Sequence, residues 1–165
     1  MIIEGGDKWQ DLRAHKLAKE FGKNFIILAG TNEYQRVNEI KNTGAKFIVP
    51  LNFPNAQDVE DPNDARFVAL ADLKHWEMAP ANAGALEKAG IQFALTQYGL
   101  RDAATFAANL SKAIQNGLSE SYALKALTTI PAQLLGIQDK FGSIETGKYA
   151  NLILTNGPLF KEKTS

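Results

Sequence analysis

The sequence predicts an α/β protein built from parallel strand–helix units, and two observations carry this prediction. Continuous apolar runs at residues 25–29 and 47–51 are typical of strands that are buried on both faces of a parallel sheet. Segments with the apolar spacing of a helix alternate with such runs, as they do where crossover helices join parallel strands. About four of these units fill residues 1–117, whereas a complete eight-stranded barrel needs about 200 residues or more. The predicted fold is therefore a partial, half-sized TIM-type βα barrel.

The first unit consists of a short strand at residues 2–5 and a helix that ends at about Phe21. Asp7 can cap this helix, because its carboxylate can accept hydrogen bonds from the first free backbone N–H groups. Gly22 is a typical stop signal. The apolar face of the helix is expected to consist of Ala14, Leu17, Ala18 and Phe21.

The second and third units continue the alternation. Residues 25–29 are the second predicted strand, and Thr31 or Asn32 caps a helix over residues 33–41. Residues 47–51 are the third strand. The segment 52–64 is rich in proline, asparagine and aspartate, which indicates a long loop.

The fourth unit begins after a helical stretch over residues 68–89, which Pro80 breaks and Gly90 ends. Residues 91–95 form the fourth predicted strand. Asp102 then caps a helix that runs to Asn116, with its inward face made of Phe106, Leu110, Ala113 and Ile114.

The last fifty residues contain three further signals. A helix opens at Ser119, with Tyr122, Ala123, Ala126 and Leu127 at helical spacing. Pro131 suits the first turn of a second, short helix that ends at Gly136. A glycine-bracketed turn at 142–148 is followed by a predicted strand at 151–154.

This last region resembles the C-terminal part of the amidohydrolase superfamily, and more narrowly its imidazolonepropionase-like and enamidase-like branch. The whole stretch 116–160 carries the resemblance, including TTIPAQLLG at 128–136 and GSIETGKYANLIL at 142–154. It implies that residues 1–117 are strands five to eight of a barrel, that 118–140 are the closing helices, and that 141–165 begin a small composite β-sandwich. It also implies that this chain is the second half of its barrel.

Members of this superfamily bind zinc or a similar divalent metal through histidines and an aspartate at strand ends, and the metal activates a water molecule. The resemblance places the sixth-strand histidine at Ala29 and the eighth-strand aspartate at Tyr98. Glu4 lies near the fifth-strand ligand position. We therefore predict that the ligand positions are degenerate, and we expect no metal, no cofactor and no catalytic residue in this chain itself.

Five polar residues at or after predicted strand ends are candidates for lining a pocket at the barrel mouth: Glu4, Asn32, Asn52, Gln97 and Tyr98. Each has a plainer alternative. Asn52 precedes Phe53-Pro54 and can satisfy turn backbone groups, and Asn32 can be a helix cap with Glu33 as a first-turn acid.

Both histidines and the tryptophan near Met78 lie in predicted helices, away from the strand ends. His15 and His75 are interpreted as surface or helix-packing residues rather than as ligands or general bases. Trp76 is interpreted as a core residue rather than as a ligand wall.

The composition limits the partners. The chain has 165 residues, 18 basic and 18 acidic side chains and no cysteine. This balance gives no reason to expect binding to nucleic acid or to a membrane surface. No apolar run approaches the roughly 18 residues of a membrane helix, and the first residues lack the features of a signal peptide. We expect a soluble chain, and the sequence does not indicate its cellular compartment. We also expect the chain to pair with a missing N-terminal half or with a copy of itself, and to accept a small-molecule ligand.

Two functions remain open at this point. The chain is either a segment of a hydrolase that cleaves C–N bonds in small molecules, or a degenerate, non-catalytic barrel module with a structural or binding role beside an active module. A chain that is only a fragment without a function of its own is a third possibility.

Overall fold

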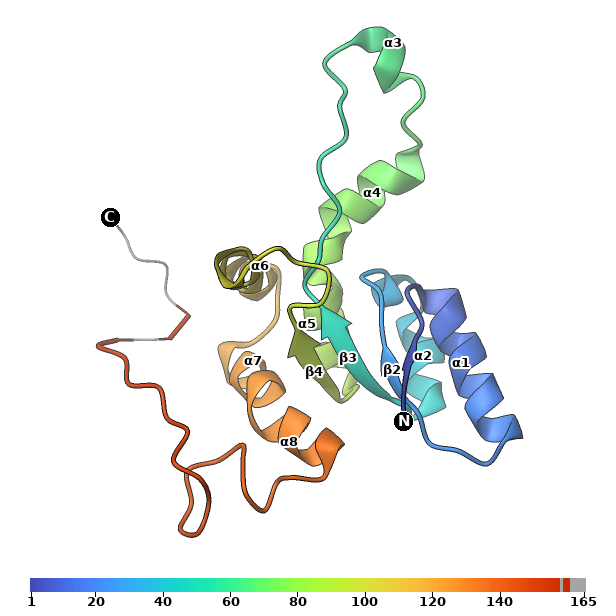
Figure 1. Cartoon of the computed structure of the whole chain (residues 1–165). Coiled ribbons are helices and arrows are strands. Elements are labelled where there is room, and N and C mark those ends of the chain that lie inside the picture. The colour runs from blue at the N-terminus through green and yellow to red at the C-terminus, as the bar shows by residue number, and fades with distance from the viewer. Residues whose placement is uncertain (158, 161–165) are drawn as a thin grey trace.

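A computed structural model describes residues 1–157, 159 and 160 of the chain. Four parallel strands form one sheet in the order β1-β2-β3-β4 (Figure 1), so each strand pairs with the strand that precedes it in the sequence. The strands are β1 (Ile2–Glu4), β2 (Ile26–Leu28), β3 (Lys46–Pro50) and β4 (Phe93–Thr96). This arrangement is a partial TIM-type barrel and confirms the predicted fold class.

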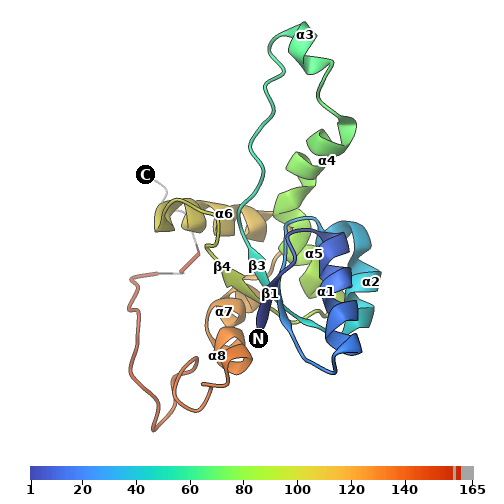
Figure 2. The ribbon, with the colours of Figure 1, turned by 45° about the vertical axis from the view of Figure 1, so that its right-hand side comes forward.

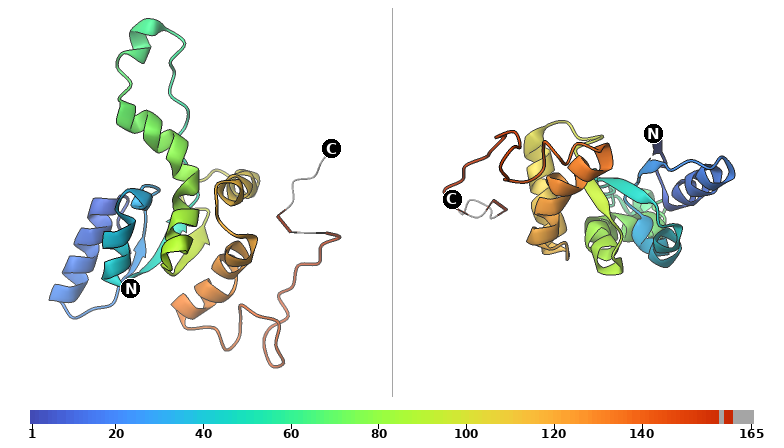
Figure 3. Two further views of the ribbon diagram at one scale, coloured as in Figure 1. Left: turned by 180° about the vertical axis from the view of Figure 1, so that it is seen from behind. Right: turned by 90° about the horizontal axis from the view of Figure 1, so that it is seen from below.

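Helices connect the strands along one face of the sheet. Helix α1 (Lys8–Glu20) joins β1 to β2, and the short η1 (Glu33–Arg36) with α2 (Val37–Thr43) joins β2 to β3. The connection from β3 to β4 contains α3 (Pro62–Ala65), α4 (Leu70–Met78), η2 (Ala79–Ala81) and α5 (Asn82–Ala89). Figure 3 shows α1, α2 and α5 beside the sheet, whereas α3 and α4 project away from it.

Local sequence signals set the ends of these helices. The Asp7 carboxylate accepts hydrogen bonds from the backbone N–H groups of Trp9 and Gln10 at 2.7 and 2.9 Å, which caps α1. Asp102 caps α6 (Ala103–Gln115) in the same way. Gly90 ends α5 with a left-handed backbone, at φ +76°, that other residues adopt only with strain. The predicted caps Asp7 and Asp102 and the predicted stop at Gly90 are therefore confirmed, whereas Asn32 at the start of η1 makes no capping hydrogen bond.

The main core lies between the helices and one face of the sheet. Ile27, Phe47 and Phe93 are adjacent in register across β2, β3 and β4, and each is at most 1% exposed. The alternate residues Leu28 and Ile48 point to the other face and are only half-buried. The helix face of the sheet is thus fully packed, whereas the face that would line a barrel is partly open.

Helix α1 buries a narrower stripe than predicted. Ala14 and Ala18 are buried, but Leu17 is 42% and Phe21 is 69% exposed. The buried stripe begins instead at Asp11, and it faces η1 and α2. The prediction that Leu17 and Phe21 belong to the buried face is wrong, because α1 contacts neighbours on one side only.

The long connection after β3 extends away from the sheet. Figures 1 and 2 show residues 54–69 projecting from the body before the chain returns along α4. Phe67, between α3 and α4 in this projection, is 88% exposed. The predicted loop at 52–64 is present, with the single helical turn α3 at its end.

The C-terminal region closes with α7 (Glu120–Leu127) and α8 (Thr129–Leu135), both of which pack against β4. Ser119 caps α7, and Gly136 ends α8, as predicted. The glycine-bracketed turn is also present, with Lys148 Nζ donating a hydrogen bond to Ser143 Oγ. No helix of the described residues is both long enough and apolar enough to span a membrane.

The predicted strand at 151–154 is wrong within the described residues. This segment has no strand conformation, and Leu152, Ile153 and Leu154 are 62%, 84% and 97% exposed. A strand needs a neighbour that takes its backbone hydrogen bonds. No described strand lies beside this segment, so its apolar pattern does not produce a strand here.

Candidate functional site

The carboxyl ends of the four strands meet at one edge of the sheet, which is where barrel proteins place their sites. Glu4 is the last residue of β1, and Tyr98 follows β4. The Tyr98 hydroxyl donates a hydrogen bond to Glu4 Oε1 at 3.1 Å, which joins residues that are 94 positions apart. This hydrogen bond and the negative charge of Glu4 raise the pKa of the Tyr98 phenol. Two of the five predicted site residues are therefore in direct contact.

The residues at this edge do not fit a catalytic zinc ion. Such an ion needs about three protein ligands with nitrogen, oxygen or sulfur donors. Ala29, which follows β2, is buried and has no side-chain atom that can bind a metal. The Tyr98 hydroxyl is a hydrogen-bond donor to the Glu4 carboxylate. No group of three or more His, Cys, Asp or Glu side chains within the described part of the chain could hold a metal ion.

The turn after β2 forms hydrogen bonds to neighbouring helices. Asn32 Oδ1 accepts a hydrogen bond from the backbone N–H of Lys8 at 2.9 Å, so it connects this turn to the start of α1 and does not cap η1. Thr31 Oγ1 lies 3.3 Å from His75 Nε2, and the His75 ring stacks on Tyr34. Burial lowers the pKa of His75. These contacts agree with the interpretation of His75 as a packing residue.

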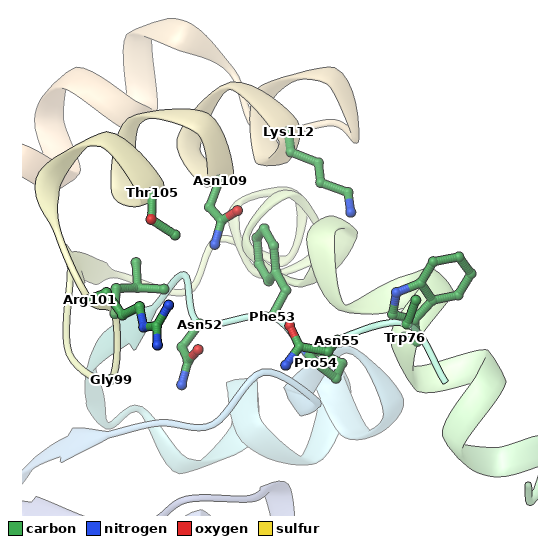
Figure 4. Close-up of a pocket in the computed structure, with 12 residues that line it drawn as sticks. Asn52, Phe53, Pro54, Asn55, Trp76, Gly99, Arg101, Thr105, Asn109 and Lys112 are labelled. Atoms are coloured by element: carbon green, nitrogen blue, oxygen red, sulfur yellow. The ribbon is translucent and has the colours of Figure 1, made fainter. Parts of the chain in front are cut away.

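A cavity of about 700 Å³ lies beside this edge, between the loops after β3 and β4 and the helices α4 and α6. Figure 4 shows Asn52 and Phe53 from the first loop, Arg101 from the second, and Asn109 and Lys112 from α6. Asn52 contacts Gly99 so closely that a Cβ atom there would lie 2.5 Å from Asn52 Nδ2. Of the five predicted residues, Asn52 lines this cavity, and Gln97 is exposed on the loop after β4.

The cavity lining is basic and rich in hydrogen-bond donors. It contains Arg101 and Lys112 and no acidic residue. Neither cation forms an ion pair within the described residues. Asn109 Nδ2 donates to the Leu51 carbonyl oxygen at 2.7 Å, which fixes the orientation of its side chain. Such a lining is suited to an anionic or carbonyl-rich small molecule.

Sequence reasoning missed most of the cavity. Thr105, Asn109 and Lys112 recur at helical spacing on α6, and this polar stripe is the signal that could have identified one wall. Trp76 was predicted to be a core residue; it is 38% exposed and forms part of the opposite wall, so that prediction is wrong. The cavity forms because the β3–α3 and β4–α6 loops converge.

The fold and the strand-end site define the chain as part of an α/β-barrel protein. A sequence model of the amidohydrolase family matches residues 55–165, which is more than half of the chain. The chain therefore belongs to the amidohydrolase family. The narrower imidazolonepropionase-like branch remains a prediction.

Two solved structures support the fold. The structure of an amidohydrolase from Thermotoga maritima MSB8 is 28% identical with a TM-score of 0.70, and the alignment covers 90% of this chain and 36% of that chain. An uncharacterized protein of known structure is 17% identical with a TM-score of 0.65, covering 98% of this chain and 39% of that chain. This chain thus spans little more than a third of the length of these relatives. No curated protein matches the sequence.

Proposed function

We propose that this chain forms the C-terminal half of an amidohydrolase-type barrel and supplies a small-molecule binding surface, while the metal centre for C–N bond hydrolysis is not built from its residues. The observation that carries this proposal is the hydrogen bond from Tyr98 to Glu4. By resemblance, Tyr98 stands where the family has an aspartate ligand. Its hydroxyl donates to the one carboxylate that lies at the end of β1.

Metal content tests this proposal. The chain purified without chelator, and then dialysed against zinc or manganese, is expected to hold far less than one metal ion per chain by elemental analysis, because Glu4 alone binds a divalent ion weakly. Tyr98→Phe frees Glu4 from its hydrogen bond and is a matched control that is expected to remain metal-poor. Stoichiometric metal in the wild-type chain that Glu4→Gln abolishes would contradict the proposal.

The cavity beside the strand ends is the proposed ligand site, and its chemistry favours a small molecule with a carboxylate. Arg101→Gln is expected to weaken binding of a small carboxylate, such as an N-acetyl amino acid, by about tenfold or more, because a charge-assisted hydrogen bond contributes about 1.5–3 kcal/mol. Isothermal titration calorimetry measures this change. Lys41→Gln on α2, which is not part of the cavity lining, is the control. Equal binding by wild type and Arg101→Gln would exclude this cavity as the carboxylate site.

The open sheet supports the proposal that another half-barrel completes this one. Within the described residues β1 and β4 each pair on one side only, and Ile2 on β1 is 51% exposed. Exposed strand edges favour pairing with a further chain or segment. We propose the N-terminal half of the barrel as the partner. Sedimentation at increasing concentration would reveal self-association if a second copy takes its place.

A second function is favoured by the position of Glu4. It is the last residue of β1, next to the place where the resemblance puts a metal ligand, so ligands from another segment could complete a hydrolytic site with it. In that case a reconstituted barrel would hydrolyse cyclic amides or related C–N bonded compounds, and Glu4→Gln would lower its metal content. Unchanged metal content in that variant would exclude a role for Glu4.

A further inference from the structure

Two carboxyl groups are buried side by side beneath the turns that follow β1 and β2. Asp11 on α1 and Glu33 on η1 are both 0% exposed. The backbone of Gly5 lies directly over the Asp11 carboxyl group, which occupies the space that a Cβ atom at Gly5 would need. Asp11 begins the buried stripe of α1, but neither group takes part in the strand-end site or lines the cavity described above.

Glu33 is held by groups that can only donate. Its Oε1 accepts a hydrogen bond from the backbone N–H of Gly30 at 2.8 Å, and its Oε2 accepts one from Asn82 Nδ2 at 2.6 Å. The Asn82 Oδ1 in turn accepts from the backbone N–H of Tyr34 at 2.8 Å. This arrangement suits an ionised Glu33, because a carboxylate only accepts hydrogen bonds. It connects the turn after β2 to α5.

Asp11 has a different environment. Neither of its two buried carboxyl oxygens has a hydrogen-bond partner among the described residues, and the acid beside it is Glu33. Asp7, which precedes α1, is the other charged group that acts on Asp11. On the side of Glu33 lies His75 of α4, and the His75 ring is in turn close to Lys8. No Lys, Arg or His side chain of the described chain forms an ion pair with Asp11 or Glu33.

Two ionised carboxylates cannot be buried together at low cost without a cation. Burial, and then the negative charge of Glu33, raise the pKa of Asp11 from 3.8 to about 9. A protonated Asp11 has one O–H donor, and Glu33 is the acceptor beside it. A neutral Asp11 therefore removes the repulsion between the two groups and can give one of its own oxygens a hydrogen-bond partner.

We propose that Asp11 and Glu33 share a single proton, and that this proton clamps α1 and the turn after β2 together beneath the barrel mouth. Asp11 donates from α1, Glu33 accepts on η1, and Glu33 in turn fixes Gly30 at the end of β2. Loss of the proton places two negative charges in the same buried space. The clamp then opens, and the turn that carries Thr31 and Asn32 is released from α1.

The clamp predicts a definite pH dependence. Below about pH 4 both the folded and the unfolded chain hold the Asp11 proton, and between about pH 4 and pH 9 only the folded chain holds it. Stability therefore falls as pH rises through this window, because the unfolded chain binds fewer protons. Because of Asp11, the unfolding equilibrium constant is expected to increase by up to about tenfold for each unit that the pH rises within this window. Above about pH 9 the folded chain also loses the proton and this contribution stops growing.

Carbon NMR of the side-chain carboxyl groups tests the proton directly on the wild-type chain. The Asp11 signal is expected to keep its protonated position at pH 7, whereas the exposed Asp102, whose pKa is lowered by its hydrogen bonds to Thr105, titrates in the acid range. An Asp11 signal that moves together with that of Asp102 would overturn the proposal.

Two variants test the clamp. Asp11→Asn keeps an N–H donor for Glu33 but cannot titrate. Its unfolding equilibrium constant is therefore expected to lack the extra pH dependence of the wild type. Asp102→Asn is the matched control, and it is expected to retain that pH dependence. Asp11→Ala removes the donor, and hydrogen exchange of the Gly30 amide is expected to accelerate by at least about tenfold relative to Asp11→Asn at the same pH. The shared-proton clamp would be refuted if the ratio of the unfolding constants of wild type and Asp11→Asn stayed constant from pH 5 to 8. It would also be refuted if the Gly30 amide exchanged at the same rate in Asp11→Asn and Asp11→Ala.

Discussion

Replacement of Phe47 by alanine is expected to destabilise the chain by about 3–5 kcal/mol, because it leaves a cavity in the centre of the core. Phe47 lies on β3, which pairs with strands on both sides, and its neighbours in register are Ile27 and Phe93. It is 1% exposed. Urea denaturation followed by circular dichroism measures the change.

Phe21→Ala is the matched control for this prediction. The same side chain is removed, but Phe21 is 69% exposed after α1, so the expected change is within about 0.5 kcal/mol. Similar losses in the two variants would mean that the packing between helices and sheet is not the main source of stability.

Replacement of Gly30 is expected to have the second large effect. A Cβ atom at Gly30 would overlap the carbonyl oxygen of Gly6 and lie 3.3 Å from the Cα of Asp7, so the turns after β1 and β2 could not keep their contact. Gly30→Ala is expected to cost about 1–3 kcal/mol, and Gly30→Val more, because the obstacle is backbone that cannot rotate away. Thermal and urea denaturation measure both.

Gly157→Ala is the control for Gly30, since no heavy atom lies within 4 Å of a Cβ atom there. Its stability is expected to stay within about 0.5 kcal/mol of the wild type. If Gly30→Ala changed the stability as little as Gly157→Ala, the turns after β1 and β2 would have to be able to move apart at little cost. The close contact that buries Asp11 would then not be rigid.

Sequence patterns were sufficient for the features of the fold that depend on nearby residues. Asp7 and Asp102 cap helices through hydrogen bonds to residues two or three positions away, and Gly90 ends a helix through its own backbone conformation. These interactions are complete within one turn, so the local sequence specifies them. The apolar runs at 25–29 and 47–51 likewise predicted β2 and β3, because strands of a parallel sheet that is covered by helices are rich in apolar residues.

The features that sequence reasoning missed depend on distant contacts. Glu33 was expected to be a first-turn acid, yet it is fully buried beside Asp11 because α1 packs against η1. The cavity wall formed by Trp76 and Lys112 depends on how two loops converge. The tail at 151–154 shows the reverse error, since a strand pattern without a neighbouring strand does not form a strand.

The candidate site falls between these cases. The sequence predicted that Glu4 and Tyr98 would lie at the strand ends, because that position follows from the parallel repeat. Their hydrogen bond could not be predicted, since it depends on how strongly the sheet curves between β1 and β4. Sequence alone therefore gives the location of such a site but not its contacts.

The order of the strands in the sheet also bears on how the chain is made. Because each strand pairs with the one before it, a newly synthesised strand finds its partner already exposed from the ribosome, and no later segment has to be threaded between two earlier ones. Such sequential pairing keeps the contacting segments close along the chain, which favours fast folding. Domains generally fold as they are synthesised from the N-terminus. This part of the barrel can accordingly assemble strand by strand during translation, with each new strand adding to the edge of the strand before it and β4 pairing last of the four.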